Sequence, residues 1–138
     1  MTESMEMLQK TPLWSGLDQQ DLRLIAKSSK ERNFESGQTI VKKGDPGVGF
    51  YLILEGAVEV RSDGKTLSKL GPGQFFGEMS VLDDQPRSAD VVTVEPSRIL
   101  FLSAASFKTL IFANPKIAWK LLQEFVRRMR NIDKWLSE

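Results

Sequence analysis

The sequence predicts a mainly β domain flanked by helices, and three features of the chain support this fold class. Between residues 34 and 101, short runs of β-branched and aromatic residues alternate with glycine, proline and aspartate turns. Such regular punctuation is typical of an antiparallel sandwich or barrel. On both sides of this region, apolar residues recur at helical spacing. With 138 residues, 41% of them hydrophobic, the chain suits one domain with its own core.

The N-terminal part, residues 1–33, is expected to be helical. Its clearest helix spans residues 17–29, where apolar residues keep the helical period. Asp18 is a suitable N-cap, and Leu17 can pack against Leu22 across the first turn.

Residues 34–103 form the predicted β region. The runs that predict strands most clearly are Thr39–Val41, Phe50–Leu54, Val58–Val60, Val91–Val94 and Ile99–Phe101. Asp63-Gly64 predicts a two-residue hairpin turn, because both positions tolerate a positive φ. The spacing allows about eight strands, which favours a sandwich or barrel over alternating βαβ units.

The C-terminal part, residues 104–137, returns to a helical period. A short helix is expected over residues 104–112, then a second one that Asn114 caps and Pro115 begins. The apolar stripe of the second helix consists of Ala118, Leu122, Phe125, Met129, Ile132 and Leu136. We expect this stripe to face the β region, a partner chain, or each in turn.

Composition excludes several kinds of function. The chain has no cysteine and no histidine, so it lacks thiol nucleophiles, the commonest general base and the commonest metal ligand. Its start is acidic without the pattern of an export signal, and no apolar run approaches the roughly 20 residues that span a bilayer. These features predict a cytoplasmic protein. The net charge of +1 does not provide the broad basic surface of a nucleic-acid binder.

The segment 73–92 carries the most informative chemistry. Gly77 lets the backbone approach another group closely, and a helical turn from Met79 would present N–H groups to an anion. Arg87 offers a forked cationic donor suited to two phosphate oxygens. Glu78 beside an anion would be repelled unless it held a separate hydroxyl, such as a ribose 2′-OH. The alternative is a simple ion pair between Glu78 and Arg87 that bridges the loop.

The order of residues in this segment resembles the phosphate-binding cassette of the cyclic nucleotide-binding domain family. That family includes regulatory subunits of cAMP-dependent kinase, the catabolite activator protein and cyclic-nucleotide-regulated channels. The cassette stands here as Phe76-Gly77-Glu78-Met79-Ser80 and Pro86-Arg87-Ser88-Ala89. Two further matching motifs are Gly44-Asp45-Pro46-Gly47 with Phe50-Tyr51-Leu52-Ile53-Leu54-Glu55-Gly56, and Pro12-Leu13-Trp14-Ser15-Gly16-Leu17. The resemblance covers about residues 8–136.

The resemblance implies an eight-stranded antiparallel β-roll, jelly-roll-like, with a short cassette helix and a C-terminal lid helix. It assigns the cyclic phosphate to Arg87 and the ribose 2′-OH to Glu78, with backbone N–H groups completing the phosphate site. The implied nucleotide-binding residues are Phe76, Gly77, Glu78, Met79, Ser80, Pro86, Arg87, Ser88 and Ala89. Val60 and Leu67 are expected on the base side of the pocket, and Arg130 or Trp135 over the base.

The resulting expectation is a regulatory sensor rather than an enzyme, one domain over residues 1–138, with no cofactor and no metal. Its ligand is expected to be cAMP rather than cGMP, because relatives with alanine or serine after the arginine tend to favour cAMP, and Ser88 stands there. Asp90 departs from the commoner uncharged residue and would weaken phosphate binding unless it points outward. The C-terminal helix would signal by moving, to a second copy or an effector protein. The alternative is an interaction module that kept the fold and lost the ligand.

Overall fold

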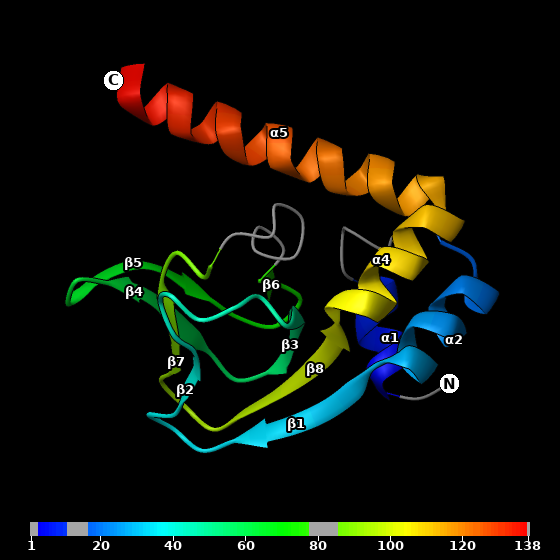
Figure 1. Ribbon diagram of the computed structural model, residues 1–138, viewed down its shortest axis with the longest axis horizontal. Coiled ribbons are helices and arrows are strands. Elements are labelled where there is room, and N and C mark those ends of the chain that lie inside the picture. The colour runs from blue at the N-terminus through cyan, green and yellow to red at the C-terminus, as the bar shows by residue number, and fades with distance from the viewer. Residues whose placement is uncertain (1–2, 11–16, 78–85, 138) are drawn as a thin grey trace.

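The computed structural model describes residues 3–10, 17–77 and 86–137, without the side chains of residues 3, 4, 124, 125, 128 and 131–137. Helices flank a region of strands in the described chain (Figure 1). The elements are α1 (Glu3–Lys10), α2 (Gln19–Ser28), β1 (Lys30–Phe34), β2 (Thr39–Val41), β3 (Gly49–Glu55), β4 (Val58–Ser62), β5 (Lys65–Leu70), β6 (Phe75–Phe76), β7 (Asp90–Thr93), β8 (Ser97–Ser103), α4 (Ala104–Ala113) and α5 (Pro115–Ser137).

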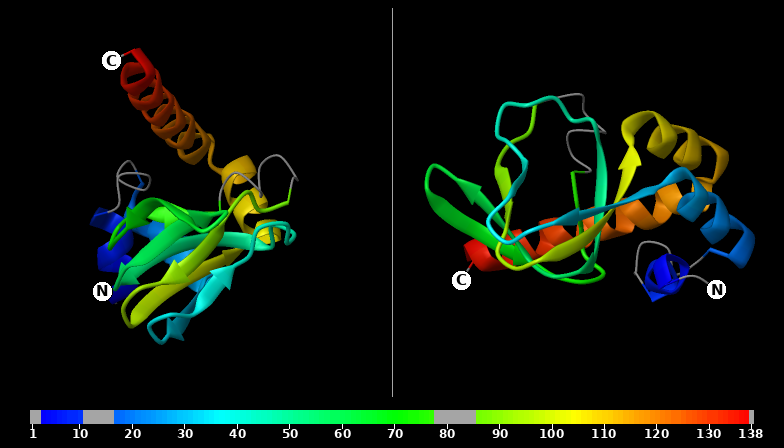
Figure 2. Two further views of the ribbon diagram at one scale, coloured as in Figure 1. Left: turned by 90° about the vertical axis from the view of Figure 1, so that its left-hand side faces the viewer. Right: turned by 90° about the horizontal axis from the view of Figure 1, so that it is seen from below.

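The strands form two four-stranded sheets. One has the order β1-β8-β3-β6 and the other the order β2-β7-β4-β5. Neighbouring strands in both sheets run antiparallel. Seen from below, the two sheets curl around a shared interior (Figure 2). The predicted eight-stranded antiparallel β-roll is therefore confirmed. The cassette helix was predicted within residues 78–85, which lie outside the described part of the chain.

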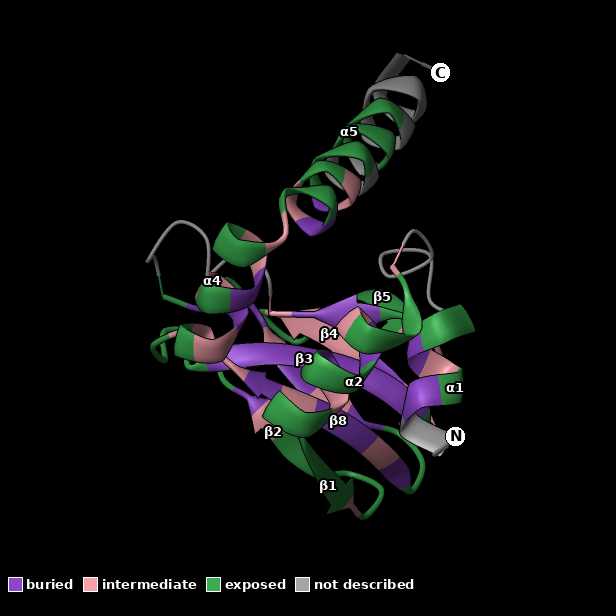
Figure 3. Cartoon of the chain, turned by 90° about the vertical axis from the view of Figure 1, so that its right-hand side faces the viewer, coloured by how far each residue is buried: buried purple, intermediate pink, exposed green. Residues whose placement is uncertain are grey.

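Strand β3 is buried on both faces, and its neighbour β8 is buried or partly buried along its length (Figure 3). Phe50 and Leu52 pack on the helical side, whereas Tyr51 and Ile53 belong to the cluster inside the roll. Because alternate side chains of a strand point to opposite faces, both sets must be apolar. This arrangement explains the unbroken apolar run Phe50–Leu54 that marks this strand in the sequence.

The helices cover the outer face of the sheet that contains β3. Leu22 and Ile25 of α2, Phe107 of α4 and Ile117 of α5 are each at most 1% exposed and belong to one cluster. The rings of Phe50 and Phe107 stack with centroids 5.0 Å apart and an angle of 7° between their planes. This aromatic pair joins the C-terminal helices to the sheet.

Local signals in the sequence account for several element boundaries. The Asp18 carboxylate accepts a hydrogen bond from the Asp21 N–H at 2.9 Å, which confirms it as the N-cap of α2. Asp63 and Gly64 have φ values of 53° and 77° and join β4 to β5. The predicted hairpin turn with two positive φ angles is therefore confirmed.

Helix α1 lies within the N-terminal part that was expected to be helical. Two details differ from the sequence prediction. Strand β1 begins at Lys30, inside the part expected to be helical. The sequence pattern did not predict this strand, because an exposed edge strand of charged residues lacks the alternation of apolar residues. Asn114 was expected to cap α5, but its side-chain amide donates to the Leu110 carbonyl at 3.0 Å and so serves the end of α4. The Asn114 carbonyl accepts from the Ile117 N–H at 3.0 Å.

The long helix α5 meets the rest of the molecule mainly near its start and then extends across the top of the roll (Figure 1). Ile117 and Leu121 are buried, whereas Leu122 and Met129 of the predicted stripe are 55% and 61% exposed. Ala118 of the same stripe is partly exposed, so the described part of the stripe faces mainly outward, and Ile117 and Leu121 make the contact with the core. None of the described helices has the length and apolar character that crossing a membrane requires.

Candidate functional site

The side chain of Arg87 lies buried between the backbones of Gly49 and Gly77. It is 5% exposed, although it stands in the connection between β6 and β7. Its Nη1 atom donates to the Gly77 carbonyl at 2.9 Å, and its Nη2 atom donates to the Gly49 carbonyl at 2.7 Å. The guanidinium group therefore links the start of β3 to the residue that follows β6, and charge-assisted hydrogen bonds of this kind are strong.

The main chain of Arg87 is held by the turn between β2 and β3. The Gly44 N–H donates to the Arg87 carbonyl at 2.9 Å, and the Arg87 N–H donates to the Asp45 carbonyl at 2.8 Å. The Gly44-Asp45-Pro46-Gly47 motif is thus adjacent to the cassette arginine in space. Both segments were singled out in the sequence, but their contact was not predicted.

Glycine is required at both carbonyl acceptors of the guanidinium group. Gly77 has a φ of 95°, and a Cβ atom there would lie 2.8 Å from Arg87 Nη1 and from the Gly49 oxygen. A Cβ atom on Gly49 would overlap the ring of Phe101 and approach the Leu102 oxygen to 2.7 Å. Any larger residue would therefore disturb the place where the arginine is held.

Aromatic rings border the guanidinium group inside the roll. The Arg87 Cζ atom lies 5.8 Å from the ring centroid of Tyr51, within the range of a cation–π contact. Tyr51 stacks on Phe76 with centroids 4.9 Å apart. Burial raises the pKa of Tyr51, while the positive charges of Arg87 and Arg32 oppose that rise. The tyrosine hydroxyl therefore remains neutral at physiological pH.

The structure describes part of the predicted cassette. Phe76 is buried, Gly77 is partly exposed, and Arg87 and Ala89 are buried next to the exposed Pro86 and Ser88. Glu78, Met79 and Ser80 lie outside the described residues. Their assigned roles, and the alternative ion pair between Glu78 and Arg87, stay predictions.

The described residues that are expected near the base differ in their exposure. Val60 of β4 packs against the cluster inside the roll, whereas Leu67 of β5 is 61% exposed. Arg130 of α5 is exposed, and the side chain of Trp135 lies outside the described set. These four assignments also stay predictions.

A polar cluster on strands β4 and β5 was not anticipated from the sequence. The Glu59 carboxylate accepts from Arg61 Nη2 at 2.9 Å and from the Thr66 hydroxyl at 3.1 Å. Hydrogen bonds from Arg61 and then Thr66 lower the pKa of Glu59 below its usual value. Glu59 alternates with the inward-packed Val58 and Val60, so the cluster lies on the outer face of its sheet.

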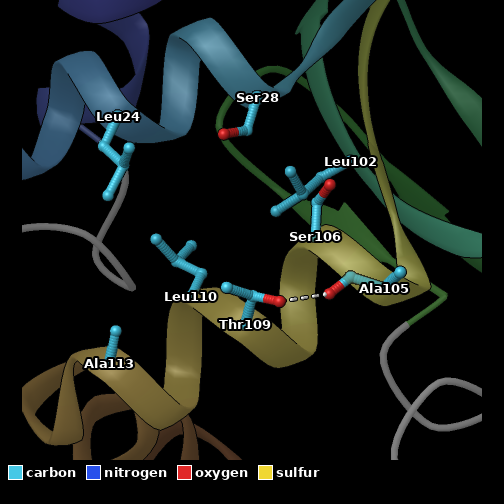
Figure 4. Close-up of a pocket in the computed structure, with 8 residues that line it drawn as sticks. All are labelled: Leu24, Ser28, Leu102, Ala105, Ser106, Thr109, Leu110 and Ala113. Carbon is cyan, nitrogen blue, oxygen red and sulfur yellow. Dashed lines mark hydrogen bonds between the residues drawn. The ribbon is translucent and has the colours of Figure 1, made fainter.

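A separate cavity of about 240 Å³ lies outside the roll, between α2, β8 and α4 (Figure 4). Leu24, Leu102 and Leu110 line it, and the hydroxyl groups of Ser28, Ser106 and Thr109 are its polar side chains. It has no charged lining residue, so it does not suit a phosphate. Among the described residues, no three acidic side chains gather closely enough to hold a metal ion.

Comparison with known proteins gives consistent matches. Residues 31–114 match the family model described as the cyclic nucleotide-binding domain. The Cyclic AMP receptor protein of Thermus thermophilus is 35% identical over 128 residues, which cover 89% of this chain and 59% of that protein. The cAMP-dependent protein kinase regulatory subunit of Yarrowia lipolytica is 34% identical over 113 residues, which cover 79% of this chain and 30% of that protein.

Solved structures show the same likeness. The crystal structure of Thermus thermophilus Catabolite Activator Protein superposes with a TM-score of 0.83 at 36% sequence identity, covering 92% of this chain and 62% of that one. The chain therefore spans less than two thirds of each of these three relatives.

Proposed function

The chain belongs to the cyclic nucleotide-binding domain family, whose domains are typically regulatory rather than catalytic, and on that premise we propose that it is a cAMP receptor. Arg87 would pair with the cyclic phosphate. The observation that carries this proposal is the buried guanidinium group of Arg87, which Gly49 and Gly77 hold at the cassette position. A planar, permanently charged fork at such a site suits two phosphate oxygens.

The remaining ligand contacts follow from the family pattern. Glu78 would accept a hydrogen bond from the ribose 2′-OH, and backbone N–H groups from Gly77 to Ser80 and at Ala89 would complete the phosphate site. Val60 and Leu67 would face the base, with Arg130 or Trp135 above it. Binding of this kind requires no cofactor and no metal.

cAMP is the better candidate than cGMP on two grounds. Ser88 follows Arg87, where relatives with serine or alanine tend to favour cAMP. Two matching relatives also carry cAMP in their names, the Cyclic AMP receptor protein and the cAMP-dependent protein kinase regulatory subunit.

Signalling would occur through movement of the C-terminal helices. Helix α5 contacts the core through Ile117 and Leu121 near its start, so a shift of α4 would swing its distant end. The cavity of about 240 Å³ between α2 and α4 leaves room for such a shift. A ligand would move this equilibrium only by binding one helix position more tightly than the other.

The outer face of α5 would receive the partner, either a second copy of the chain or an effector protein. Trp119, Leu122, Val126 and Met129 are between 49% and 62% exposed and recur at alternating intervals of three and four residues. This spacing is typical of a helix that packs against another helix.

The test of the function is calorimetric titration of nucleotide-free protein with cAMP and with cGMP. We expect micromolar or tighter binding of cAMP and weaker binding of cGMP. Absence of heat with both nucleotides, from protein shown to be folded, would contradict the proposal. That result would favour the protein-interaction module that retains only the fold.

The role of Glu78 needs a separate titration with 2′-deoxy-cAMP. We expect this analogue to bind the wild type more weakly than cAMP does, and Glu78→Ala to bind both nucleotides with similar affinity. An equal loss for the analogue in both proteins would contradict the ribose contact.

A further inference from the structure

Asp90, the first residue of β7, joins two segments that are far apart in the sequence. Its Oδ1 atom accepts a hydrogen bond of 2.7 Å from the Lys43 N–H. Asp90 is partly exposed and stands between the buried Ala89 and Val91, as expected from strand alternation. The carboxylate is thus directed toward the turn that follows β2.

The same turn holds the main chain of Arg87. Gly44, the residue after Lys43, donates to the Arg87 carbonyl at 2.9 Å, and the Asp45 carbonyl accepts from the Arg87 N–H at 2.8 Å. Three consecutive turn residues are therefore bonded to Arg87 or Asp90. Displacement of this turn would move the arginine main chain with it.

The Lys43 side chain extends this connection to the hairpin between β4 and β5. Its Nζ atom lies 3.3 Å from the Ser62 hydroxyl and 3.5 Å from the Asp63 carboxylate. Lys43 is therefore bonded through its backbone to Asp90 and through its side chain to the hairpin. The bond from the Lys43 N–H to Asp90 is thus one of the contacts that fix this turn, beside its two bonds to the Arg87 main chain.

We propose that Asp90 is a positioning residue for Arg87: by accepting from Lys43, it fixes the turn that sets where the guanidinium group is held. This inference rests on the proposed phosphate-binding role of Arg87. In this role Asp90 would favour nucleotide binding, whereas a carboxylate near a phosphate is expected to weaken binding by repulsion. If the hydrogen bond matters most, removing the Asp90 carboxylate weakens cAMP binding. If repulsion matters most, removing it strengthens cAMP binding.

Asp90→Asn keeps the Oδ1 acceptor and removes the charge, whereas Asp90→Ala removes both. We expect Asp90→Ala to weaken cAMP binding about tenfold, the size of one hydrogen bond to a charged group. Asp90→Asn should bind within about threefold of the wild type. The matched control is Glu95→Ala, which removes an exposed acid beyond the other end of β7 and should bind like the wild type. If Asp90→Asn and Asp90→Ala both bind cAMP as tightly as the wild type or more tightly, the inference is wrong.

A second measurement needs no nucleotide. Amide hydrogen exchange at Lys43, Gly44 and Arg87 reports directly on the three bonds of the turn. We expect faster exchange at these amides in Asp90→Ala, protection retained in Asp90→Asn, and no change in Glu95→Ala. Asp90→Val, whose β-branched side chain suits a strand and has no hydrogen-bond acceptor, provides a folded variant without the carboxylate if Asp90→Ala is unstable.

The two measurements separate the inference from the proposed function. Unchanged exchange at Arg87 in Asp90→Ala or Asp90→Val would overturn the positioning role, whatever the titrations give. Failure of the wild type to bind cAMP would overturn the proposed function instead, and the exchange rates would then decide by themselves whether Asp90 fixes the turn.

Discussion

The Nη2 atom of Arg87 donates a hydrogen bond of 2.7 Å to the carbonyl oxygen of Gly49, a residue 38 positions earlier in the chain. With the bond from Nη1 to Gly77, the guanidinium group connects the start of β3 to the end of β6. Arg87 therefore contributes to the stability of the fold as well as to the proposed phosphate site. Measurements on Arg87 variants must separate these two contributions.

Replacing Arg87 with alanine is expected to lower the free energy of unfolding by about 3 kcal/mol. The bond to the Gly49 carbonyl is buried and the bond to the Gly77 carbonyl is partly buried, and a buried carbonyl that loses its donor costs roughly 1–3 kcal/mol. Urea unfolding monitored by circular dichroism gives the value. A variant as stable as the wild type would show that the two bonds contribute little.

The binding effect of the same substitution is expected to be larger than its effect on stability. Arg87→Ala should weaken cAMP binding by about 3–5 kcal/mol, because it leaves a buried phosphate charge without its partner. Arg87→Lys keeps the charge but lacks the fork, so it should retain only part of the affinity. Calorimetry of both folded variants checks these expectations, and wild-type affinity in Arg87→Lys would argue against two-oxygen contact.

The sequence could predict that Arg87 is chemically important, but not what holds it. The cassette pattern identifies the residue, whereas its acceptors depend on how β6 pairs with β3 and on where the turn at Gly44 lies. Those are tertiary contacts, and local pattern does not encode them. Strand β3 was predictable because burial on both faces requires a continuous apolar run, and β1 was not because its exposed, charged residues resemble a loop.

The same reasoning explains the outcome for α5. Its periodicity identified a helix with an apolar stripe, but period alone does not decide which face meets the core. Ile117 and Leu121 make that contact, while Leu122 remains 55% exposed. The choice depends on how α4 directs the start of α5, which the sequence pattern does not specify.

Gly77→Ala is expected to impair nucleotide binding more than its small size suggests. The residue has a φ of 95°, and the added Cβ atom would lie 2.8 Å from Arg87 Nη1 and from the Gly49 oxygen. The guanidinium group would have to move, so we expect at least a tenfold loss of cAMP affinity. Gly37→Ala is the matched control, since its φ of 82° is similarly strained but a Cβ atom there meets nothing within 4 Å. Equal cAMP affinity in the two variants would contradict displacement of Arg87 as the cause.

Stability is expected to fall at high pH because of Tyr51. Burial raises the pKa of Tyr51 in the folded protein above its ordinary value of about 10. The unfolded chain therefore releases the tyrosine proton first, and the free energy of unfolding falls as the pH rises from about 10 through the folded-state pKa. Urea unfolding between about pH 9 and 11 should show a steeper loss in the wild type than in Tyr51→Phe.

Tyr51 can also be titrated directly, because it is the chain's single tyrosine. The ultraviolet absorbance of tyrosinate then reports its pKa in the folded protein. In Arg87→Ala this pKa should rise further, since the nearby positive charge that favours the ionised form is removed. An unchanged titration would show that Arg87 does not influence the ring.

Phe107 and Phe112 on α4 allow a direct test of how the C-terminal helices are attached to the roll. Phe107 is fully buried and stacks on Phe50, whereas Phe112 on the same helix is 81% exposed. Phe107→Ala should lower the free energy of unfolding by about 3–5 kcal/mol, and Phe112→Ala should change it by less than about 0.5 kcal/mol.

If α4 transmits the ligand signal to α5, Phe107→Ala should also make the amides of α4 exchange faster in the absence of nucleotide, with strands β3 and β8 still protected. Faster exchange in all three elements together would mean that α4 and the sheet open as one unit, and the helices could then not shift independently of the roll.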